Sequence, residues 1–509
     1  MNEKSIPHYP EPIWRKTVSL PRFPSLQEDI EADVAVAGAG MAGIVTAYLL
    51  AKEGIKTVLF DAGEIANGTS GHTTAKITAQ HGLVYDELIQ HIGIERAGLY
   101  YKANEAAASL IKNIIRENDI SCSFSHQAAF LYTNSDDYFE KLEKEMRAYD
   151  TLGIHGEWLD RLPDGIPAKK AVKMERQAQF HPLSYLKALV EFLMEKQVPI
   201  FENTTAKDIE YGNPIKIKTE KGHTISCNYV CICTHYPFYD AKGLYFTRMY
   251  PERSYLIAVK PEKPFPGGMY INTEQPTRSF REVEAEGEKL LLVGGENHKT
   301  GQGGPMIRHY EVLQEFAEKT FGIETFYCRW SAQDLTTLDK IPYIGPVTKM
   351  EPNVFIETGF RKWGMTGTHV AALIMRDLIL QKENPYVEMF APQRFEADPM
   401  VKNFVSANVD VAEHLVKGKF DLPDKPLEQL EPDEGAVVRI NGKRAGAYKD
   451  NEGNIYLLDT TCTHMGCEVK WNSGERTWDC PCHGSRFSFT GEVVEGPAKD
   501  PLTKIEYQE

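Results

Sequence analysis

The sequence CTHMGCEVKWNSGERTWDCPCHGS, residues 462–485, brings cysteine and histidine together in two short loops. The first loop holds Cys462 and His464, and the second holds Cys480 and His483 after a segment that can form a hairpin. A [2Fe–2S] cluster with two thiolates on one iron and two imidazoles on the other needs this set of ligands. Zinc also binds cysteine and histidine, but zinc knuckles seldom carry a further cysteine in each loop. The segment therefore predicts a site for an iron–sulfur cluster.

Over residues 431–509 the chain resembles the Rieske family of [2Fe–2S] proteins. The match includes both loops together with Gly466 and Ser485. Gly496-Pro-Ala498 corresponds to the proline loop that covers the cluster in this family. The ligands that the resemblance implies are Cys462 and Cys480 for one iron, and His464 and His483 for the other.

The resemblance also implies a disulfide between Cys467 and Cys482. Rieske proteins of respiratory and photosynthetic bc-type complexes carry this pair, and ring-hydroxylating oxygenases usually lack it. A hydroxyl at Ser485 raises the reduction potential of a cluster, because it stabilises the negative charge of the reduced state. High-potential members add a tyrosine where this chain has Phe487. We therefore expect a potential below the top of the Rieske range of roughly −150 to +300 mV.

The composition is that of a globular protein with more than one domain. The 509 residues are 42% hydrophobic and 25% charged. The formal net charge of −15 argues against nucleic acid or an anionic membrane as partner, since both attract basic patches. The sequence has no apolar run of transmembrane length and no apolar signal-peptide core near its start. We expect a cytoplasmic protein, where a disulfide would be unusual.

A second motif lies near the start of the chain. The apolar segment DVAVA, residues 33–37, is followed by GAGMAG, residues 38–43, by a helix-favouring stretch to Lys52, and by a second apolar segment that ends at Asp61. This is the G-x-G-x-x-G fingerprint of dinucleotide binding in its strand–turn–helix–strand context. The glycines allow a pyrophosphate to approach the backbone, and Asp61 suits the ribose hydroxyls. The cofactor-binding residues that the motif predicts are Gly38, Gly40, Met41, Ala42, Gly43 and Asp61.

Later segments indicate that the dinucleotide is FAD. They read GTSGHTTAK (68–76), NYVCICTH (228–235), DKIPYIGP (339–346), NVFIETG (353–359) and GMTG (364–367). Residues 14 to 385 resemble the D-amino-acid oxidase family of flavoproteins, most of all its glycine oxidase, sarcosine dehydrogenase and glutamylputrescine oxidase branches. The resemblance adds the cofactor-binding residues Thr69, Ser70, His72, Thr73, Gly359, Gly364, Met365 and Thr366.

Two positions of the flavoprotein segment need comment. His235 stands where family members usually have a glycine that the cofactor approaches closely. His72 aligns with the histidine that carries covalent flavin in dimethylglycine and sarcosine dehydrogenases, but it can also serve as a hydrogen-bonding neighbour of the ring. The sequence leaves both readings of His72 open, and acid precipitation separates them, because only non-covalent flavin is released.

The expected fold class is an α/β FAD-binding Rossmann-like domain with an inserted α+β substrate domain, built on an antiparallel sheet, and a C-terminal all-β Rieske domain. We assign residues 1–90, 175–245 and 331–385 to the FAD-binding domain, and residues 91–174 and 246–330 to the substrate domain. Residues 386–430 read as a linker, and residues 431–509 form the Rieske domain.

The two cofactors together predict an FAD-dependent amine or amino-acid dehydrogenase or oxidase. Electrons from a small-molecule substrate would pass through the cluster, by its solvent-side histidine end, to an acceptor protein or a quinone. Candidates for substrate contact are Arg281, whose guanidinium suits a carboxylate, and Glu296 and His298; Arg361 and Trp363 border the flavin turn.

Three alternatives remain at this stage. An external reductant can feed the cluster while the flavin does reductive or oxygenating chemistry, although a second dinucleotide fingerprint is missing. A Rieske oxygenase needs a non-haem-iron domain after the cluster, and only 26 residues follow His483. The third alternative is a redox sensor whose cofactor state controls the binding of a partner.

Overall fold

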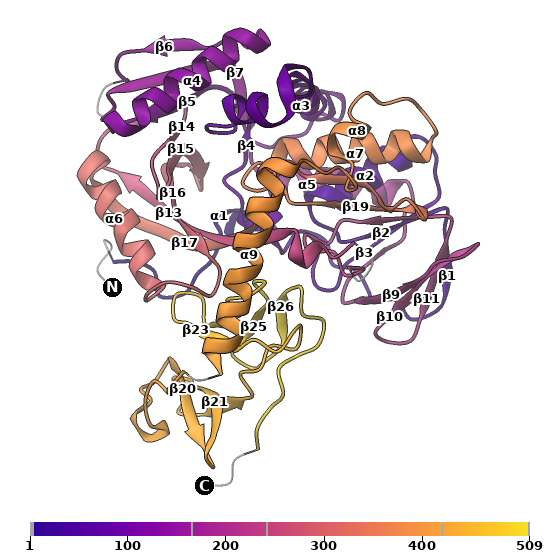
Figure 1. Ribbon diagram of the computed structural model, residues 1–509, viewed down its shortest axis with the longest axis vertical. Helices are drawn as coiled ribbons and strands as arrows, with labels where there is room; N and C mark the ends of the chain where they lie inside the picture. Colours follow the sequence, from indigo (N-terminus) through magenta and orange to yellow (C-terminus); the bar gives the residue numbers. More distant parts are fainter. Residues whose placement is uncertain (1–4, 164–165, 241–242, 420, 507–509) are drawn as a thin grey trace.

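The structure is a computed structural model that describes residues 5–163, 166–240, 243–419 and 421–506. Figure 1 shows a large body and a smaller C-terminal part below it, with helix α9 (Ala397–Gly418) running from one to the other. The predicted fold class is confirmed: an FAD-type α/β unit, an inserted sheet and a C-terminal β domain are all present.

The centre of the body is a six-stranded sheet in the order β18-β19-β12-β2-β3-β8. Its strands are β2 (Val34–Ala37), β3 (Thr57–Phe60), β8 (Ile200–Phe201), β12 (Tyr229–Ile232), β18 (Tyr343–Thr348) and β19 (Glu351–Thr358). All neighbours are parallel except β18 and β19. Strands β2 and β3 are buried along their whole length, as expected for apolar runs in a parallel sheet that is covered on both faces.

Different layers cover the two faces of this sheet. Val34 and Val36 pack with the helices α2 (Met41–Lys52), α5 (Pro182–Glu195) and α7 (Gly364–Ile379). Ala35 and Ala37 point the other way and pack with a four-stranded sheet. That sheet has the order β1-β11-β10-β9 and consists of β1 (Ile30–Glu31), β9 (Ala206–Glu210), β10 (Ile215–Thr219) and β11 (Thr224–Cys227). The alternation of side chains along β2 therefore builds two separate cores.

A large, mostly antiparallel sheet forms the inserted unit. Its strands are β4 (Lys76–Ile77), β5 (Ser125–Thr133), β6 (Glu157–Leu159), β7 (Lys170–Gln179), β13 (Met249–Pro261), β14 (Met269–Asn272), β15 (Arg278–Ala285), β16 (Glu288–Lys299) and β17 (Ile323–Thr337). Among the strand pairs that the structure describes in this sheet, only β14 and β5 are parallel. The helices α3 (Tyr85–Glu117), α4 (Asp136–Leu152) and α6 (Ile307–Phe321) pack on it.

The C-terminal part contains two small antiparallel sheets. One is formed by β20 (Glu434–Ile440), β21 (Lys443–Lys449) and β22 (Ile455–Leu458), and the other by β23 (Lys470–Asn472), β24 (Thr477–Asp479), β25 (Arg486–Ser488) and β26 (Val493–Glu495). The cluster loops belong to the second sheet, whose core surrounds the buried Trp478.

The segment expected to be a linker is mostly helical. It contains α8 (Val387–Phe390) and α9, and α9 is anchored where Asn408 Nδ2 donates a hydrogen bond to Thr247 O at 3.0 Å. The Cys482 sulfur lies 3.8 Å from Val411 O on the same helix. Helix α9 therefore contacts both the body and the cluster loops.

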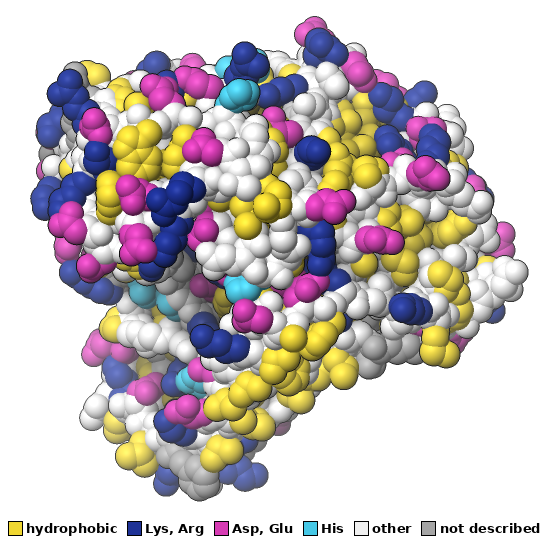
Figure 2. All heavy atoms as spheres, turned by 45° about the horizontal axis from the view of Figure 1, so that its top comes forward, with side chains coloured by type: hydrophobic (Ala, Val, Ile, Leu, Met, Phe, Trp, Pro, Cys, Tyr) yellow, Lys and Arg dark blue, Asp and Glu magenta, His cyan; other side chains and the backbone are white. Residues whose placement is uncertain are grey.

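On the face that Figure 2 shows, acidic and basic side chains are interspersed, and neither sign of charge forms a large patch. Within the residues described, no helix combines the length and apolar character needed to cross a membrane.

Candidate functional site

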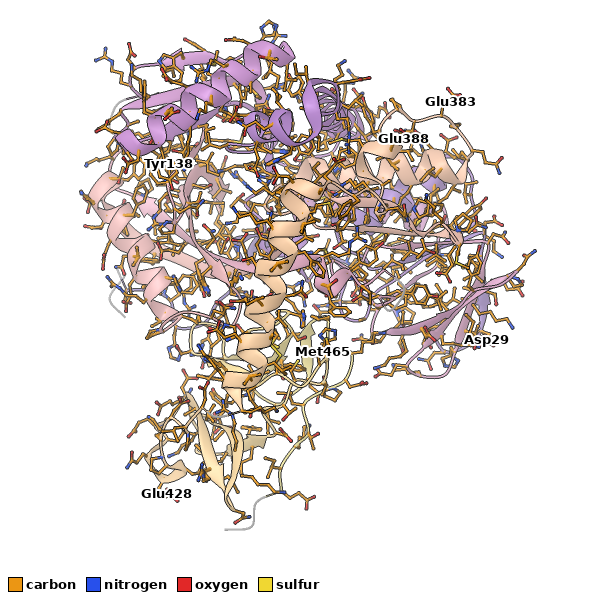
Figure 3. The ribbon with its side chains drawn as sticks, in the orientation of Figure 1. Asp29, Tyr138, Glu383, Glu388, Glu428 and Met465 are labelled. Atoms are coloured by element: carbon orange, nitrogen blue, oxygen red, sulfur yellow. A yellow bond between two sulfur atoms is a disulfide. The ribbon has the colours of Figure 1, made fainter. Side chains whose placement is uncertain are left out.

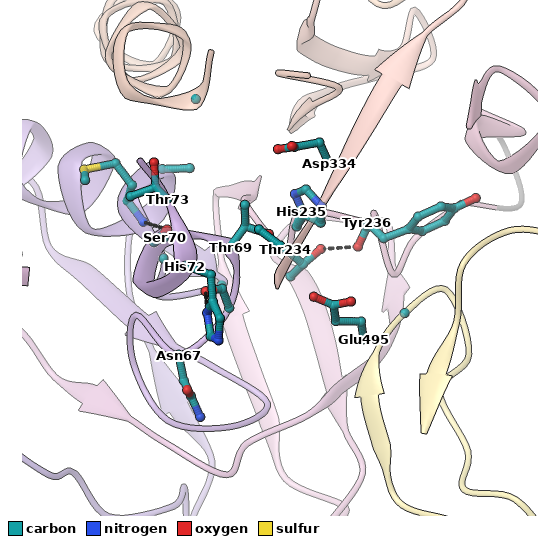
Figure 4. Close-up of a pocket in the computed structure, with 18 of the residues that line it drawn as sticks. Asn67, Thr69, Ser70, His72, Thr73, Thr234, His235, Tyr236, Asp334 and Glu495 are labelled. Carbon is teal, nitrogen blue, oxygen red and sulfur yellow. Dashed lines mark hydrogen bonds between the residues drawn. The ribbon is translucent and has the colours of Figure 1, made fainter. Parts of the chain in front are cut away.

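A cavity of about 820 Å³ lies where the six-stranded sheet, the inserted sheet and the C-terminal part meet. Figure 4 shows its interior. Most of the predicted cofactor-binding residues line it: Gly38, Gly40, Met41, Ala42, Asp61, Thr69, Ser70, His72, Thr73, Gly364 and Met365. Residues from segments far apart in sequence thus form one site, and its volume suits a ligand the size of a dinucleotide.

The glycine turn between β2 and α2 leaves no room for side chains. Gly38 has φ +98°, and a Cβ there would lie 2.5 Å from Cys233 O. A Cβ on Gly43 would lie 1.8 Å from Gly38 O, so Gly43 packs behind the turn instead of lining the cavity. Ser70 Oγ accepts a hydrogen bond from Met41 N at 2.7 Å. The start of helix α2 therefore faces the cavity. A helix N-terminus in this position suits a phosphate group.

Asp61 follows β3 at the same edge of the sheet. Its carboxylate accepts hydrogen bonds from Ala39 N at 2.7 Å and from Gly63 N at 2.9 Å. Burial raises the pKa of Asp61, and these two N–H groups oppose the effect. The carboxylate is thus fixed in the cavity wall at the position expected for a ribose contact.

The loop around η1 (Thr69–His72) is held by two buried tryptophans. Trp330 Nε1 donates to His72 O at 2.8 Å, and Trp14 Nε1 donates to Thr73 O at 2.7 Å. His72 Nδ1 lies 2.8 Å from Gly68 O. Because a carbonyl only accepts, Nδ1 carries the proton in this arrangement, and Nε2 is the nitrogen left for a cofactor.

The turn before α7 forms the opposite end of the cavity. Gly364 and Met365 line it. Thr366 lies behind and donates to Thr78 O at 3.4 Å. Gly359 has φ +77°, and a Cβ there would lie 2.3 Å from Thr337 Cγ2. Gly359 and Thr366 therefore shape the turn from outside the cavity wall.

The backbone of His235 has a left-handed conformation. Its φ is +60°, in the left-handed region that a glycine adopts most easily. The imidazole lines the cavity, and its Nε2 has no hydrogen-bond partner among the described protein atoms. Figure 4 shows His235, Asp334 and Glu495 reaching the pocket from three different segments. The chain thus presents an imidazole to the cavity at this position.

Several buried charged groups in the cavity wall were not predicted from the sequence. Burial raises the pKa of Asp334 to about 7 and that of Glu357 to about 8. Burial, with a smaller effect of Arg281, lowers the pKa of Lys76 to about 7. Lys76 Nζ donates to Tyr270 O at 3.1 Å and also bonds Ser279 Oγ, and no carboxylate contacts it in the described part of the chain. No short motif marks these residues in the sequence.

The candidates for substrate contact lie elsewhere. Arg281 donates to the backbone oxygens of Thr74 and Glu282, at 2.6 and 2.9 Å. His298 stacks on His309, and Glu296 pairs with Arg278 and with His309 Nδ1. None of the three candidates belongs to the described residues that line the cavity, whereas Arg361 and Trp363 do. The contacts of Arg281, Glu296 and His298 favour structural roles.

The four predicted cluster ligands converge in the C-terminal part. The thiols of Cys462 and Cys480 lie within reach of each other. The rings of His464 and His483 have their centroids 4.9 Å apart. Both Nδ1 atoms are buried and have no hydrogen-bond partner among the described protein atoms, as expected for nitrogens that bind a metal.

The charge states also fit a cluster. Burial lowers the pKa of His464 to about 4 and that of His483 to about 3, so both imidazoles are neutral. Backbone N–H groups of His464 and Met465 point at the Cys462 sulfur, and those of Cys482 and His483 point at Cys480. These donors stabilise thiolates, which are the form that binds iron.

The sulfur atoms of Cys467, Cys480 and Cys482 lie within 4.8 Å of one another. Cys467 and Cys482 are joined in a disulfide, which leaves Cys480 as the free thiol of this group. Ser485 Oγ accepts a hydrogen bond from Ala498 N at 3.0 Å, which ties the proline loop to the cluster loop.

The family comparisons agree with both halves of the geometry. The family model for FAD-dependent oxidoreductases of the DAO type matches residues 33–378, and the Rieske [2Fe-2S] domain model matches residues 422–506. The chain is a DAO-family flavoenzyme with a Rieske domain. It therefore binds FAD and a [2Fe–2S] cluster.

One relative matches the whole chain, and two others match about 70% of it. The Rieske 2Fe-2S iron-sulfur protein YhfW of Bacillus subtilis is 49% identical over 505 residues, which cover 99% of both chains. Gamma-glutamylputrescine oxidoreductase of Escherichia coli is 21% identical over 375 residues, 70% of this chain and 85% of that protein. The crystal structure of glycine oxidase from Geobacillus kaustophilus superposes with a TM-score of 0.61 at 18% identity, covering 72% of this chain and 99% of that one. The last likeness concerns the fold alone.

Proposed function

We propose that the chain is an FAD-dependent dehydrogenase of a small amine or amino acid that sends the electrons, one at a time, through its Rieske cluster to an external acceptor. The observation that carries the proposal is the composition of the cavity wall. The cavity is lined by Gly38 of the glycine turn and His72 of η1, and also by Thr477, Arg486 and Glu495 of the cluster-binding domain. A cluster domain that borders the flavin directly is expected where the two cofactors exchange electrons.

The residues on the substrate side of the cavity suit an amine. Lys76 projects from β4 of the inserted sheet, beside Ser279. With a pKa near 7, its buried amine can accept a proton or bind a carboxylate. Trp363 and Ile271 supply apolar surface to the cavity wall. FAD, when bound, supplies the acceptor for the hydride that leaves the carbon next to nitrogen.

The overall reaction balances with an external acceptor. Each substrate molecule loses two electrons and two protons as its C–N single bond becomes a C=N double bond, which water can then hydrolyse. The cluster carries one electron at a time. Two equivalents of a one-electron acceptor, or one equivalent of a two-electron acceptor such as a quinone, therefore regenerate the oxidised enzyme in each turnover.

The test is anaerobic mixing of the purified protein with sarcosine, dimethylglycine, glycine, proline and glutamylputrescine, followed by visible and EPR spectroscopy. Bleaching of the flavin together with a reduced Rieske signal supports the proposal. Flavin reduction with a cluster that stays oxidised contradicts the proposed electron path. If every amine leaves both cofactors oxidised, the reverse electron flow or the sensor function gains support.

A further inference from the structure

The cluster-binding domain forms one wall of the flavin cavity. Its contributions come from β24, β25, β26 and the segment after β26, which includes the proline loop. The residues that matter most are Thr477, Arg486 and Glu495. Removal of this domain would open the cavity to solvent along that side. The two cofactor sites are thus parts of one structure.

Glu495 joins the two domains at this wall. Its Oε2 accepts hydrogen bonds from Arg253 Nη2 at 2.9 Å and from Arg486 Nη1 at 3.1 Å. Arg253 belongs to β13 of the inserted sheet and is 1% exposed. Its Nη1 donates to Ser331 Oγ at 2.6 Å, and Ser331 lines the cavity. Loss of the Glu495 charge would leave two buried guanidiniums without their shared carboxylate, which is strongly destabilising for a buried pair.

The contacts of Glu495 continue through Arg486 to the cluster loop. Arg486 Nε donates to Asp479 Oδ1 at 3.2 Å, and these two residues are paired across β24 and β25. Asp479 directly precedes the ligand Cys480, and Arg486 directly follows Ser485. The contacts Arg253–Glu495–Arg486–Asp479 therefore form a continuous chain of charges from the cavity wall to the base of the cluster loop.

A second set of hydrogen bonds also connects the cluster loop with the flavin cavity. Gln333 Nε2 donates to Gly484 O at 3.0 Å, beside the ligand His483. The backbone oxygen of Gln333 accepts a hydrogen bond from Thr69 Oγ1 at 3.1 Å, and Thr69 lines the cavity. A single strand, β17, thus separates the flavin site from the cluster loop at this point.

We propose that Glu495 is a positioning residue that holds the cluster-binding domain as a wall of the flavin cavity and so fixes the gap across which the two cofactors exchange electrons. This role rests on the proposed exchange of electrons between flavin and cluster, but on no particular substrate and no particular direction of electron flow. Electron exchange across this wall moves one electron from one cofactor to the other, and no bond forms or breaks. The alternative is an ordinary ion pair whose loss leaves this exchange unchanged.

The experiment compares Glu495→Gln with Glu428→Gln in the full-length holoprotein. Glu428 is an exposed residue at the far end of the cluster-binding domain, labelled in Figure 3. The flavin is photoreduced anaerobically by a short flash, and the rate at which the cluster becomes reduced is followed by absorbance and confirmed by EPR. No substrate is needed, so the outcome is separate from that of the amine panel.

We expect the rate of cluster reduction to fall several-fold in Glu495→Gln, because electron transfer slows steeply as the gap between two cofactors widens. The Rieske EPR signal should keep its shape, and Glu428→Gln should match the wild type. Arg253→Lys serves as the second variant: it keeps the charge, loses the forked contact, and should slow the exchange in the same way. Exchange at the wild-type rate in Arg253→Lys, or in a folded Glu495→Gln protein with full cofactor content, would overturn the proposal.

Discussion

The ring of Phe246 lies edge-on to the imidazole of His483, with the ring centroids 5.6 Å apart. The same ring lies 5.7 Å from that of His464. Phe246 belongs to η2 (Tyr245–Thr247) in the flavoprotein body, and His483 is only 4% exposed. His483 therefore faces the body, whereas His464 is partly exposed. Met465, next to His464, is 49% exposed between the two parts in Figure 3, so a partner can approach the cluster there.

The glycine turn gives a direct test of the flavin site. Gly38→Ala places a Cβ 2.5 Å from Cys233 O at φ +98°, so we expect loss of FAD binding. Gly54→Ala is the matched control, because Gly54 also has a positive φ, +77°, but a Cβ there meets nothing within 4 Å. Its cost is confined to backbone strain of about 1 kcal/mol. The flavin-to-protein ratio of the purified variants is the measurement, and equal ratios would contradict the assignment.

The cluster site is tested by Cys480→Ser. A hydroxyl is a poor ligand for iron–sulfur chemistry, so iron content should fall roughly tenfold or more. Cys328→Ser is the control, since Cys328 is a buried thiol in the core of the body. Iron analysis and the Rieske EPR signal report the result, while flavin absorbance shows that the body has folded. Retention of full iron by Cys480→Ser would exclude Cys480 as a ligand.

Much of the flavin and cluster sites could be predicted from the sequence, because their residues lie in short sequence motifs. The strand–turn–helix around Gly38 and the two Cys/His loops place their functional atoms within a few residues of each other. The positions of Arg281, Glu296 and His298 could not be predicted, because the side of the inserted sheet that faces the cavity depends on its packing. Neighbouring strand residues point to opposite faces.

The interface between the domains also could not be predicted from the sequence. Nothing in the segment around Glu495 indicates that its partner is Arg253, which lies 242 residues away. A buried ion pair has no local periodicity, and it forms only when two separate folds dock. The same holds for Lys76, whose burial results from β14 and β15 folding over it.

Ser485 should tune the potential of the cluster. Its hydroxyl lies within reach of the Cys462 sulfur. A hydrogen bond that is stronger by about 1 kcal/mol in the reduced state corresponds to a shift on the order of 40 mV for one electron. Ser485→Ala should therefore lower the midpoint potential by that amount, and Phe487→Tyr should raise it if the added hydroxyl finds a cluster atom. Redox titration followed by EPR measures both, and an unchanged potential in Ser485→Ala would contradict the expected bond.

The disulfide between Cys467 and Cys482 predicts a thiol count. The chain has nine cysteines, and seven are outside the disulfide. After removal of the cluster and denaturation under non-reducing conditions, seven thiols should react, and nine should react after reduction. The bond closes a loop with a sequence separation of 15, for which the chain-entropy estimate is about 3 kcal/mol. Nine reactive thiols before reduction would show that the bond is absent from the purified protein.

The amine of Lys76 predicts a measurable dependence of protein stability on pH. Burial lowers its pKa to about 7 in the folded protein. Between this value and the ordinary pKa of about 10.4, the unfolded chain binds one more proton, so stability rises with pH across that window. Lys76→Met removes this contribution. We expect the variant to be more stable than the wild type by a few kcal/mol below pH 7, with the advantage shrinking towards pH 10.

Activity should change in the opposite sense. If the neutral amine of Lys76 accepts a proton from the substrate, wild-type kcat/KM rises as pH increases through about 7, and Lys76→Met loses this limb together with roughly 100-fold of the rate. Lys289→Met is the control, because Lys289 lies on β16 of the same sheet with a side chain that is 74% exposed. The stability profile is measured by thermal unfolding and needs no substrate. A pH limb that persists unchanged in Lys76→Met would assign the proton to another group, and Asp334, with its pKa raised by burial to about 7, would then be the next residue to test.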